Sequence, residues 1–396
     1  MANNIDSIWH DCPSDILLKI FAYLDYNSLI NCLVVNKKWM ALSKYLVKCI
    51  GYNEITKKGI YKYDKYKMKF KENTEPWQLI INCLLWFNLQ RSNVQKIYEY
   101  EMDDIKHICI CKDKIVVRTS TSIGSFSIVS HVWTQIHWET CVHYEATKYL
   151  TVIIYYEYDG NKMVLHGKSR NTTEIEPLLF DDLAIRCILV EEKYLLVLLD
   201  DGDLWRMSWN EIKWESKLIA KNCGNGGTIV TLHLHQGWIY GLCHWGSLYS
   251  VNMNGGSNFE KLCDFNIPDY ASKNMNPVFF DKCSIVVSVP SNMRAKYTVV
   301  MINDAKYIML ERPGLTCATT HGEMLLLGYE NGKVEFYAQK SIIRNDPPNA
   351  TLYLTNVVTP SHDDLAIIGL DVYESNASHH LFIATRHNIY EILLSH

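Results

Sequence analysis

The chain has 396 residues, of which 48% are hydrophobic, a share that supplies a large core and excludes a mainly disordered protein. Its formal net charge is −4, so the overall charge favours neither nucleic acid nor an anionic membrane. Thirteen cysteines lack the spacing of a disulfide framework, and the N-terminus shows no charged-then-apolar leader. We therefore expect a cytoplasmic and/or nuclear protein with reduced cysteines and two or three domains.

Residues 1–8 form a short polar tail, and residues 9–43 predict a compact set of short helices. Pro13 suits a first helical position because its missing N–H needs no partner there, and Asp11 can cap the helix. The apolar residues recur at helical spacing: Ile16, Leu17, Ile20, Phe21, Leu24, Leu29, Leu33, Val34, Trp39 and Leu42. So short a segment cannot bury this much apolar surface internally, and we expect the surplus to face a neighbour.

The pattern Pro13-x-x-Ile16-Leu17-x-x-Ile20-Phe21-x-x-Leu24-Asp25-x-x-x-Leu29, followed by Val35-Asn36-Lys37-x-Trp39, resembles an F-box. It departs from the usual pattern at Cys12, where the family carries Leu, and at Asn36, where many members have Cys or Ser. The resemblance implies docking on the small adaptor that links F-box proteins to a cullin scaffold. The adaptor contacts that it implies are Pro13, Ile16, Leu17, Ile20, Phe21, Leu24, Leu29, Val35 and Trp39. The alternative is a helical hairpin packed on the chain's own core.

Residues 44–93 are expected to connect two halves of the chain. Seven lysines between Lys57 and Lys71 interleave with aromatic residues, a composition that can bind single-stranded nucleic acid. A solvated strand or loop, with lysine stems covering the rings, is the simpler interpretation, because nothing else in the chain supports nucleic-acid binding. Thr74-Glu75-Pro76 then predicts a linker helix over about residues 75–90.

From about residue 94 the hydrophobic period changes to two and helix signals disappear. A repeated unit comprises an apolar strand, a gap, a second apolar strand, a tight polar turn and a third strand. Its copies begin near residues 105, 141, 184, 228, 276, 315 and 365. This spacing fits the ~40–45 residues of a four-stranded propeller blade. Weaker fourth strands fit between the units, at 134–138, 175–180, 259–263 and 307–310.

The seventh unit ends at Leu394 without a fourth strand, and the strand-like segment 94–100 belongs to no unit. Adding this segment to the last blade would protect an exposed edge. We therefore predict a multidomain α plus all-β chain: a helical F-box, a linker helix and a seven-bladed β-propeller over 94–396. The propeller is similar to WD-repeat propellers in architecture alone, because no Trp-Asp dipeptide occurs. A large sandwich and an eight-bladed propeller are the alternatives.

No motif indicates a catalytic residue, a metal or a cofactor. Asp200, Asp201 and Asp203 form a carboxylate cluster, but Asp and Gly in a tight turn serve the backbone. His233-x-His235, Cys243-His244 and Cys109-x-Cys111 are separate pairs, whereas a zinc site needs about four converging ligands. Packing of these histidines and cysteines in the core is the simpler interpretation.

If the blades run as in WD-repeat propellers, the turns between second and third strands open on one binding face. The candidates for substrate binding on that face are Arg294, Lys296, Arg386, His387 and Trp245. The arginines and lysine would bind phosphate or acidic side chains, and Trp245 or Trp238 would serve as an aromatic anchor. Ordinary solvated turns, and core packing of Trp238, are the simpler interpretations.

The order of the two architectures resembles the propeller class of F-box proteins. This resemblance implies the substrate receptor of an SCF-type cullin-RING ubiquitin ligase, in which the F-box binds the adaptor and the propeller holds a target. Such a chain performs no bond chemistry and contributes proximity. A ligase-independent interaction scaffold is the main alternative, and a propeller hydrolase using Asp200 or Asp203 is a further one.

Overall fold

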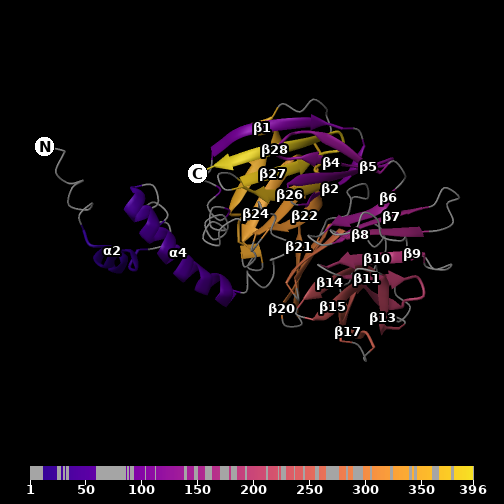
Figure 1. Ribbon diagram of the computed structural model, residues 1–396. Coiled ribbons are helices and arrows are strands. Elements are labelled where there is room, and N and C mark those ends of the chain that lie inside the picture. Colours follow the sequence, from indigo (N-terminus) through magenta and orange to yellow (C-terminus); the bar gives the residue numbers. More distant parts are fainter. Residues whose placement is uncertain are drawn as a thin grey trace.

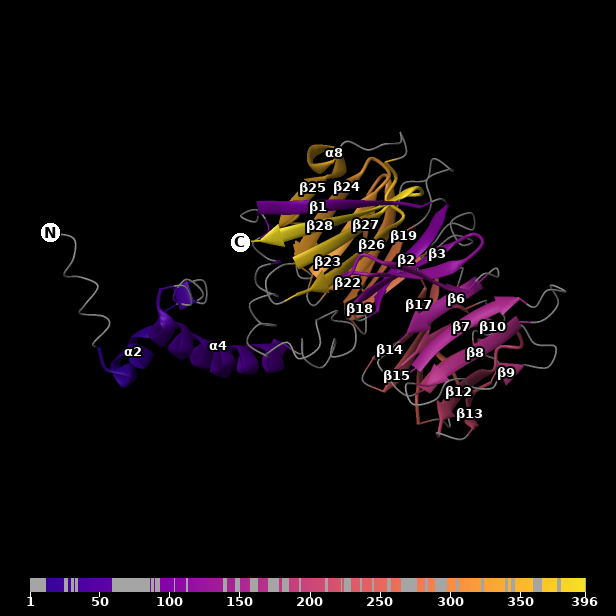
Figure 2. The same ribbon diagram turned by 45° about the horizontal axis from the view of Figure 1, so that its top comes forward.

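The computed structural model describes residues 12–24, 28–29, 32, 35–58, 86, 89 and 93–395. The last range has internal gaps, of which the longest are 170–177, 265–275 and 289–297. Its helices are α2 (Ser14–Phe21), α4 (Lys37–Lys58) and α8 (Leu354–Val357). Figures 1 and 2 show α2 and α4 as a small lobe beside a large body of strands. Among the described helices, none is long and apolar enough to cross a membrane.

Pro13 and Asn36 stand immediately before the helices α2 and α4. Pro13 is the residue before α2, and its carbonyl accepts the N–H of Leu17 at 3.1 Å. Pro13 therefore stands one position before the first helical residue. The sequence analysis had given it the first helical position itself. Asn36 precedes α4, and its side-chain oxygen accepts the N–H of Trp39 at 2.9 Å. This bond satisfies a donor that the start of the helix leaves unpaired. Asp11 lies outside the described residues.

The helix α4 runs through the first part of the predicted connector. The strand-or-loop interpretation of the lysine-rich run is wrong for Lys57 and Lys58, which end this helix, and the rest of the run lies outside the described residues. Ser43 and Val47 are buried one turn apart, and Leu42 and Leu46 pack beside them. This tertiary packing stabilises a helix that the sequence analysis did not predict in the connector. The linker helix predicted over about 75–90 lies outside the described residues, apart from Trp86 and Leu89.

The described strands form seven four-stranded antiparallel sheets, numbered here in chain order. Sheet 1 contains β2 (Ile105–Cys111), β3 (Lys114–Thr119), β4 (Ile123–Ser127) and β5 (Trp133–His137). Sheet 2 contains β6 (Cys141–Ala146), β7 (Leu150–Tyr156), β8 (Met163–Ser169) and β9 (Leu178–Leu179). Sheet 3 contains β10 (Ile185–Val190), β11 (Tyr194–Leu199), β12 (Leu204–Trp209) and β13 (Trp214–Ala220). Sheet 4 contains β14 (Ile229–His235), β15 (Trp238–Cys243), β16 (Ser247–Asn252) and β17 (Glu260–Asp264).

The last three sheets complete the series. Sheet 5 contains β18 (Asn276–Asp281), β19 (Ser284–Ser288), β20 (Thr298–Asn303) and β21 (Lys306–Glu311). Sheet 6 contains β22 (Leu315–His321), β23 (Met324–Tyr329), β24 (Lys333–Ala338) and β25 (Ala350–Tyr353). Sheet 7 contains β26 (Gly369–Glu374), β27 (His379–Ala384), β28 (Asn388–Ser395) and β1 (Asn93–Glu101). The start predicted for the last unit, near residue 365, lies about four residues before the start of β26.

The strand predicted at 94–100 is β1, and it lies beside β28 in sheet 7 (Figures 1 and 2). The antiparallel register runs from Asn93 opposite Ser395 to Glu101 opposite Asn388. The chain then turns into sheet 1, where the Ile105 N–H donates to the Arg386 carbonyl at 2.9 Å. The pairing occupies an edge of β28 that would otherwise lie open.

Each sheet contacts the next through apolar side chains or adjoining inner strands. Shared clusters join sheets 1 and 2, 2 and 3, 3 and 4, and 6 and 7. The strands β14, β18 and β22 connect sheets 4, 5 and 6. Ile108 of sheet 1 shares a cluster with Phe382 of sheet 7, so the last sheet packs on the first. Radially repeated four-stranded sheets of this kind make a β-propeller, and the prediction of an N-terminal helical segment followed by a propeller is confirmed.

A β-bulge recurs at one position of the repeat. In five sheets the register shifts directly after the first residue of the inner strand, at Ile105, Cys141, Ile185, Ile229 and Leu315. A bulge inserts one residue and increases the local twist. Its recurrence shows that these sheets are copies of one structural unit, a feature that the runs of apolar residues did not reveal.

Candidate functional site

Five of the nine residues implied as adaptor contacts hold the helical lobe together. Leu17, Phe21 and Leu29 are buried and form its core with Cys32 and Val47. Leu24 and Trp39 are partly buried against this core. The rings of Phe21 and Trp39 meet edge to face, with their centroids 4.9 Å apart. These side chains therefore fix the relative positions of α2 and α4.

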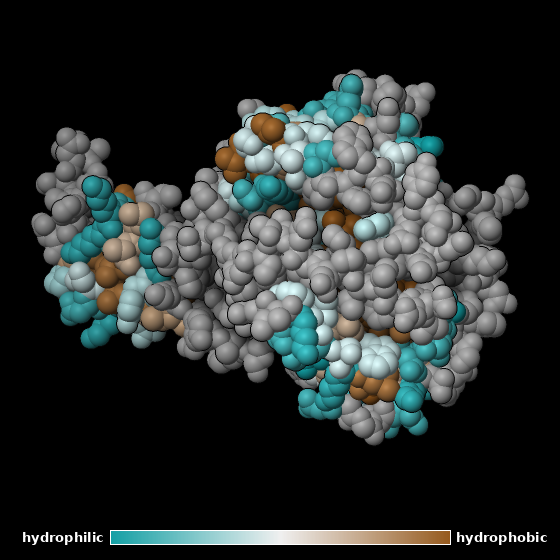
Figure 3. Space-filling view, turned by 45° about the vertical axis from the view of Figure 1, so that its right-hand side comes forward, coloured by the Kyte–Doolittle hydropathy of each residue, from teal (hydrophilic) through white to brown (hydrophobic). Residues whose placement is uncertain are grey.

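The other four residues, Pro13, Ile16, Ile20 and Val35, are exposed. Ile16 and Ile20 are one helical turn apart and lie on the same face of α2. Tyr23 follows on that side and is 92% exposed. We call Ile16, Ile20 and Tyr23 the apolar face of α2. Figure 3 shows hydrophobic surface among hydrophilic residues on the small lobe. Grouped apolar side chains in water mark an interaction site.

Tyr23 was missed because the sequence analysis followed one broad apolar stripe along residues 16–24. The spacing Ile16, Ile20, Tyr23 is also helical, but periodicity alone does not say which stripe lies inside. That assignment depends on the contacts of α2 with α4, which the structure supplies.

Among the predicted substrate-binding residues, Arg294, Lys296 and Trp245 lie outside the described residues. Arg386 and His387 lie in the turn between β27 and β28. The Arg386 Nε atom is 3.4 Å from the Asp104 carboxylate. Hydrogen bonds from Lys106 and Ser120 lower the pKa of Asp104 to about 2. Arg386 therefore faces an ionised acid of its own chain, and its charge is partly neutralised there.

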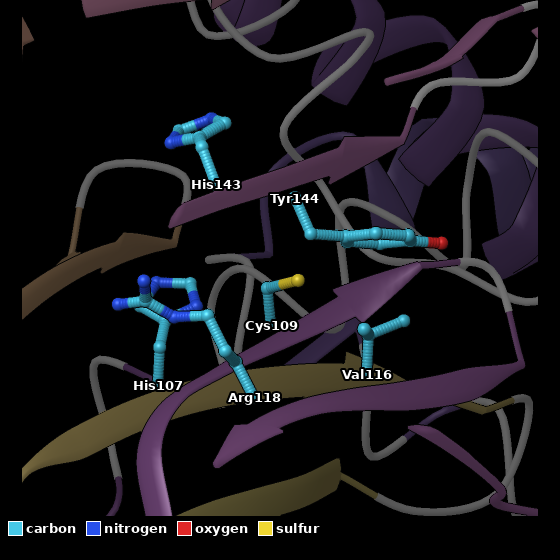
Figure 4. Close-up of a pocket in the computed structure, with 6 residues that line it drawn as sticks. All are labelled: His107, Cys109, Val116, Arg118, His143 and Tyr144. Atoms are coloured by element: carbon cyan, nitrogen blue, oxygen red, sulfur yellow. The ribbon is translucent and has the colours of Figure 1, made fainter. Parts of the chain in front are cut away.

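A pocket of about 60 Å³ lies between sheets 1 and 2. Figure 4 shows the residues that line it: His107, Cys109, Val116, Arg118, His143 and Tyr144. His107 on β2 lies directly opposite Arg118 on β3, so both side chains stand on the same face of sheet 1. His143 and Tyr144 come from β6 of sheet 2. We call this the basic pocket, because a guanidinium and two imidazoles surround it.

Part of the basic pocket lies toward the end of sheet 1 where the β3–β4 turn lies. His107 stands near the start of β2 and Arg118 near the end of β3, which places both at that end. Further along the strands Val116 packs against Tyr144 and Ile153, and the two sheets close together. The pocket escaped the sequence analysis because it joins residues of separate units. The sequence signal that could have indicated the pocket was Arg118, which directly follows the apolar run Ile115–Val117 in β3.

The carboxylates of the predicted acidic cluster serve the turn between β11 and β12. Gly202 has φ of +85°, which favours glycine. The Asp203 N–H donates to the Asp201 side chain at 2.8 Å. Asp200 pairs with Arg186 at 2.9 Å. These contacts support the interpretation of the cluster as a turn.

The metal candidates do not converge within the part of the chain that the structure describes. Among those residues, no group of three or more His, Cys, Asp or Glu side chains is placed to hold a metal ion. His233 is buried in sheet 4, as core packing predicts. Trp238, for which core packing was the simpler interpretation, is 41% exposed.

The F-box domain family matches residues 9–50 of the chain. The match confirms the resemblance and extends into α4. No curated protein is similar enough to count as a match. A chain of a solved complex of S. cerevisiae Dbp5 with Nup159, Gle1, IP6 and ADP has 11% identity and a TM-score of 0.48, over 77% of this chain and 95% of that one. The computationally designed Ika8 protein has 9% identity and a TM-score of 0.46, over 74% and 96%. With the fold described above, the family match identifies the chain as an F-box protein in which the F-box domain is followed by a β-propeller.

Proposed function

We propose that this chain is the substrate receptor of an SCF-type cullin-RING ubiquitin ligase. The F-box domain docks on the adaptor and reaches the cullin scaffold through it, and the propeller binds a target protein. The observation that carries the proposal is the apolar face of α2, exposed on a domain of the F-box family.

In this proposal the nine motif residues divide into two roles. Pro13, Ile16, Ile20 and Val35 contact the adaptor directly, together with Tyr23. Leu17, Phe21, Leu24, Leu29 and Trp39 shape the surface from behind, because they form or line the core. Full burial of one large apolar side chain contributes about 1.5–3 kcal/mol. Because Ile16 is 46% and Ile20 38% exposed, their burial on docking would contribute about 1–2.5 kcal/mol together, which changes the affinity by roughly 10- to 70-fold.

The propeller supplies the target-binding part. The proposal includes a single seven-bladed ring over 94–396, in which each of the seven sheets is one blade. It is supported by the contacts that link successive sheets and by the packing of sheet 7 on sheet 1. The domain limits proposed for the rest of the chain are 1–8, 9–43 and 44–93.

The basic pocket is a candidate site for a target side chain among the residues that the structure describes. Its guanidinium and imidazoles favour a carboxylate or phosphate group, and Tyr144 adds an aromatic wall. The other predicted target contacts remain Arg294, Lys296, Trp245, Arg386 and His387. Of these, Arg386 is the weakest candidate because Asp104 already faces it.

The chain acts without bond chemistry of its own in this role. It holds target lysines close to the ubiquitin-charged enzyme and raises their effective concentration. No cofactor or metal is required for such a contribution. The complex would act in the cytoplasm or nucleus, where we propose that the chain resides.

The deciding experiment is affinity purification from cells of the wild-type chain beside Ile20→Asp, with mass spectrometry of the proteins that co-purify. Adaptor and cullin present with the wild type and lost with the variant would support the receptor. Proteins retained by both would be candidate targets of the propeller. Absence of the cullin from the wild-type complex would overturn the proposal and favour a ligase-independent scaffold.

A further inference from the structure

Trp86, which precedes the first propeller strand by seven residues, is buried in the propeller rather than in the helical lobe. Its indole stacks on Phe336 at 6.0 Å and meets the rings of His321 and His379 edge to face at 5.7 and 5.5 Å. Leu89 joins the same cluster between sheets 6 and 7. The end of the linker is therefore part of the propeller core.

Trp86 also donates its indole N–H to the carboxylate of Glu374. The separation of these two residues along the chain is 288 positions. Glu374 is fully buried and also contacts His321 Nε2 at 2.8 Å and His379 Nδ1. We call Glu374, His321 and His379 the socket of Trp86.

The socket is charged. Burial alone would raise the pKa of Glu374, but attraction to His379 and hydrogen bonds with both histidines outweigh it and bring the value to about 2. The carboxylate is therefore ionised at neutral pH and only accepts hydrogen bonds. Burying a carboxylate costs free energy unless hydrogen bonds replace those that it made with water. Trp86 supplies one of the three hydrogen bonds described for Glu374, so the linker contributes to a polar site of the propeller.

The socket lies at the end of the sheets opposite to the basic pocket. His321 ends β22 and Glu374 ends β26, whereas His107 stands near the start of β2. The strands β22, β26 and β2 are equivalent first strands of their sheets. Linker attachment and candidate target binding therefore occupy opposite ends of the strands.

We propose that Trp86 is a positioning residue, which fixes the point where the F-box part leaves the propeller by docking in the Glu374 socket. Its consequence for ubiquitin transfer rests on the proposed function. Without this anchor the next packed residue of the linker would be Leu89, and after it Asn93 in β1. The three chain steps from Trp86 to Leu89 span up to about 10 Å when extended, and the seven steps to Asn93 span up to about 25 Å. A displacement of that size would change which target lysines meet the charged enzyme.

The test measures the distance between the two parts in the full-length chain. Spin labels are introduced through unnatural amino acids at the exposed positions Tyr45 on α4 and Tyr353 on β25, since thirteen cysteines exclude thiol labels. Pulsed electron resonance then compares the wild type with Trp86→Ala and Trp86→Phe. The exposed Trp238→Ala serves as the matched control.

We expect a narrow distance distribution for the wild type and the control, and one at least twice as broad for Trp86→Ala. Trp86→Phe, which keeps a ring but removes the N–H donor, should fall between them. Glu374→Gln keeps an oxygen acceptor and should remain narrower than Glu374→Leu. Loss of packing alone would also place Trp86→Phe between the wild type and Trp86→Ala, so the comparison of Glu374→Gln with Glu374→Leu separates the hydrogen bond from packing.

A broad wild-type distribution, or an unchanged one in folded Trp86→Ala, would overturn the anchor. If Trp86→Ala does not fold, Trp86→Phe and the two Glu374 variants decide, and equal widths in all three would overturn it. Adaptor binding is measured on the same samples. Its failure in the wild type would overturn the proposed function while leaving the distance result intact.

Discussion

Leu17 and Ile20, one helical turn apart on α2, face opposite environments. Leu17 is 0% exposed in the core of the F-box domain, whereas Ile20 is 38% exposed on the apolar face. The two residues look alike in the motif, but a charge at each should act differently. Comparing substitutions at the two positions therefore distinguishes loss of the adaptor contact from unfolding of the F-box domain.

Ile20→Asp should weaken adaptor binding by at least about 30-fold, or about 2 kcal/mol, because a carboxylate replaces an apolar contact. The F-box domain should stay folded, since Ile20 contributes little to its core. Titration calorimetry with purified adaptor and circular dichroism measure the two effects. Leu17→Asp should lose binding and helical signal together, and Trp238→Ala should change neither. If Ile20→Asp binds the adaptor with unchanged affinity, the apolar face of α2 is not the adaptor-binding surface.

Asn36→Ala should destabilise the F-box domain by about 1 kcal/mol, because the Trp39 N–H at the start of α4 loses its acceptor. Asn36→Asp should retain most of the stability, since a carboxylate oxygen also accepts that bond. Urea denaturation followed by the helical signal measures both variants. Equal midpoints for Asn36→Ala and the wild type would show that this cap contributes nothing.

Deletion of residues 94–100 should lower the melting temperature of the propeller, because β28 loses its partner strand. Ile97→Pro, which places a proline ring in β1 opposite Ile392, should act in the same direction with a smaller effect. Differential scanning calorimetry compares both with the wild type. Melting of the deletion variant at the wild-type temperature would show that β1 is dispensable for closure.

Glu374 should make stability dependent on pH in the acid range. Its pKa is about 2 in the folded chain and 4.5 in the reference state. A depressed carboxyl pKa stabilises the fold above the reference value and loses that contribution as pH falls toward 2, here about 3 kcal/mol. Glu374→Gln should flatten this part of the curve. Urea midpoints between pH 2 and pH 6 test it, and parallel curves for the two proteins would contradict it.

Arg118→Glu should reduce recovery of propeller-bound targets, whereas Arg386→Glu should have a smaller effect because Asp104 already neutralises part of the Arg386 charge. Quantitative mass spectrometry of the purified complexes compares the two variants. Adaptor recovery serves as the internal control and should not change. Equal target recovery with Arg118→Glu and the wild type would exclude the basic pocket as a binding site.

The sequence was most informative where one local pattern sufficed. The F-box motif and the β-strand units depend on spacing within a few residues, and six of the seven predicted unit starts lie within one residue of the start of an inner strand. The same local view gave no helix for the start of the connector, where packing against the core around Val47 decides the structure.

Features formed by distant residues were not predictable in this way. The basic pocket depends on Arg118 and His143 meeting across two sheets. The socket depends on Trp86 reaching Glu374 across nearly the whole propeller sequence. Neither pairing leaves a periodic signal, because the members of each pair belong to different units of the sequence.

The pairing of β1 with β28 also has a consequence for synthesis of the chain. Residues 93–101 leave the ribosome early, but their partners at 388–395 emerge after some 290 further residues. Contacts so distant in sequence form slowly, and until then β1 is an unpaired strand that invites aggregation. The F-box domain, encoded before β1, has all of its own residues available throughout this period. In a nascent or prematurely terminated chain, the F-box domain would therefore be complete before β1 could pair with β28.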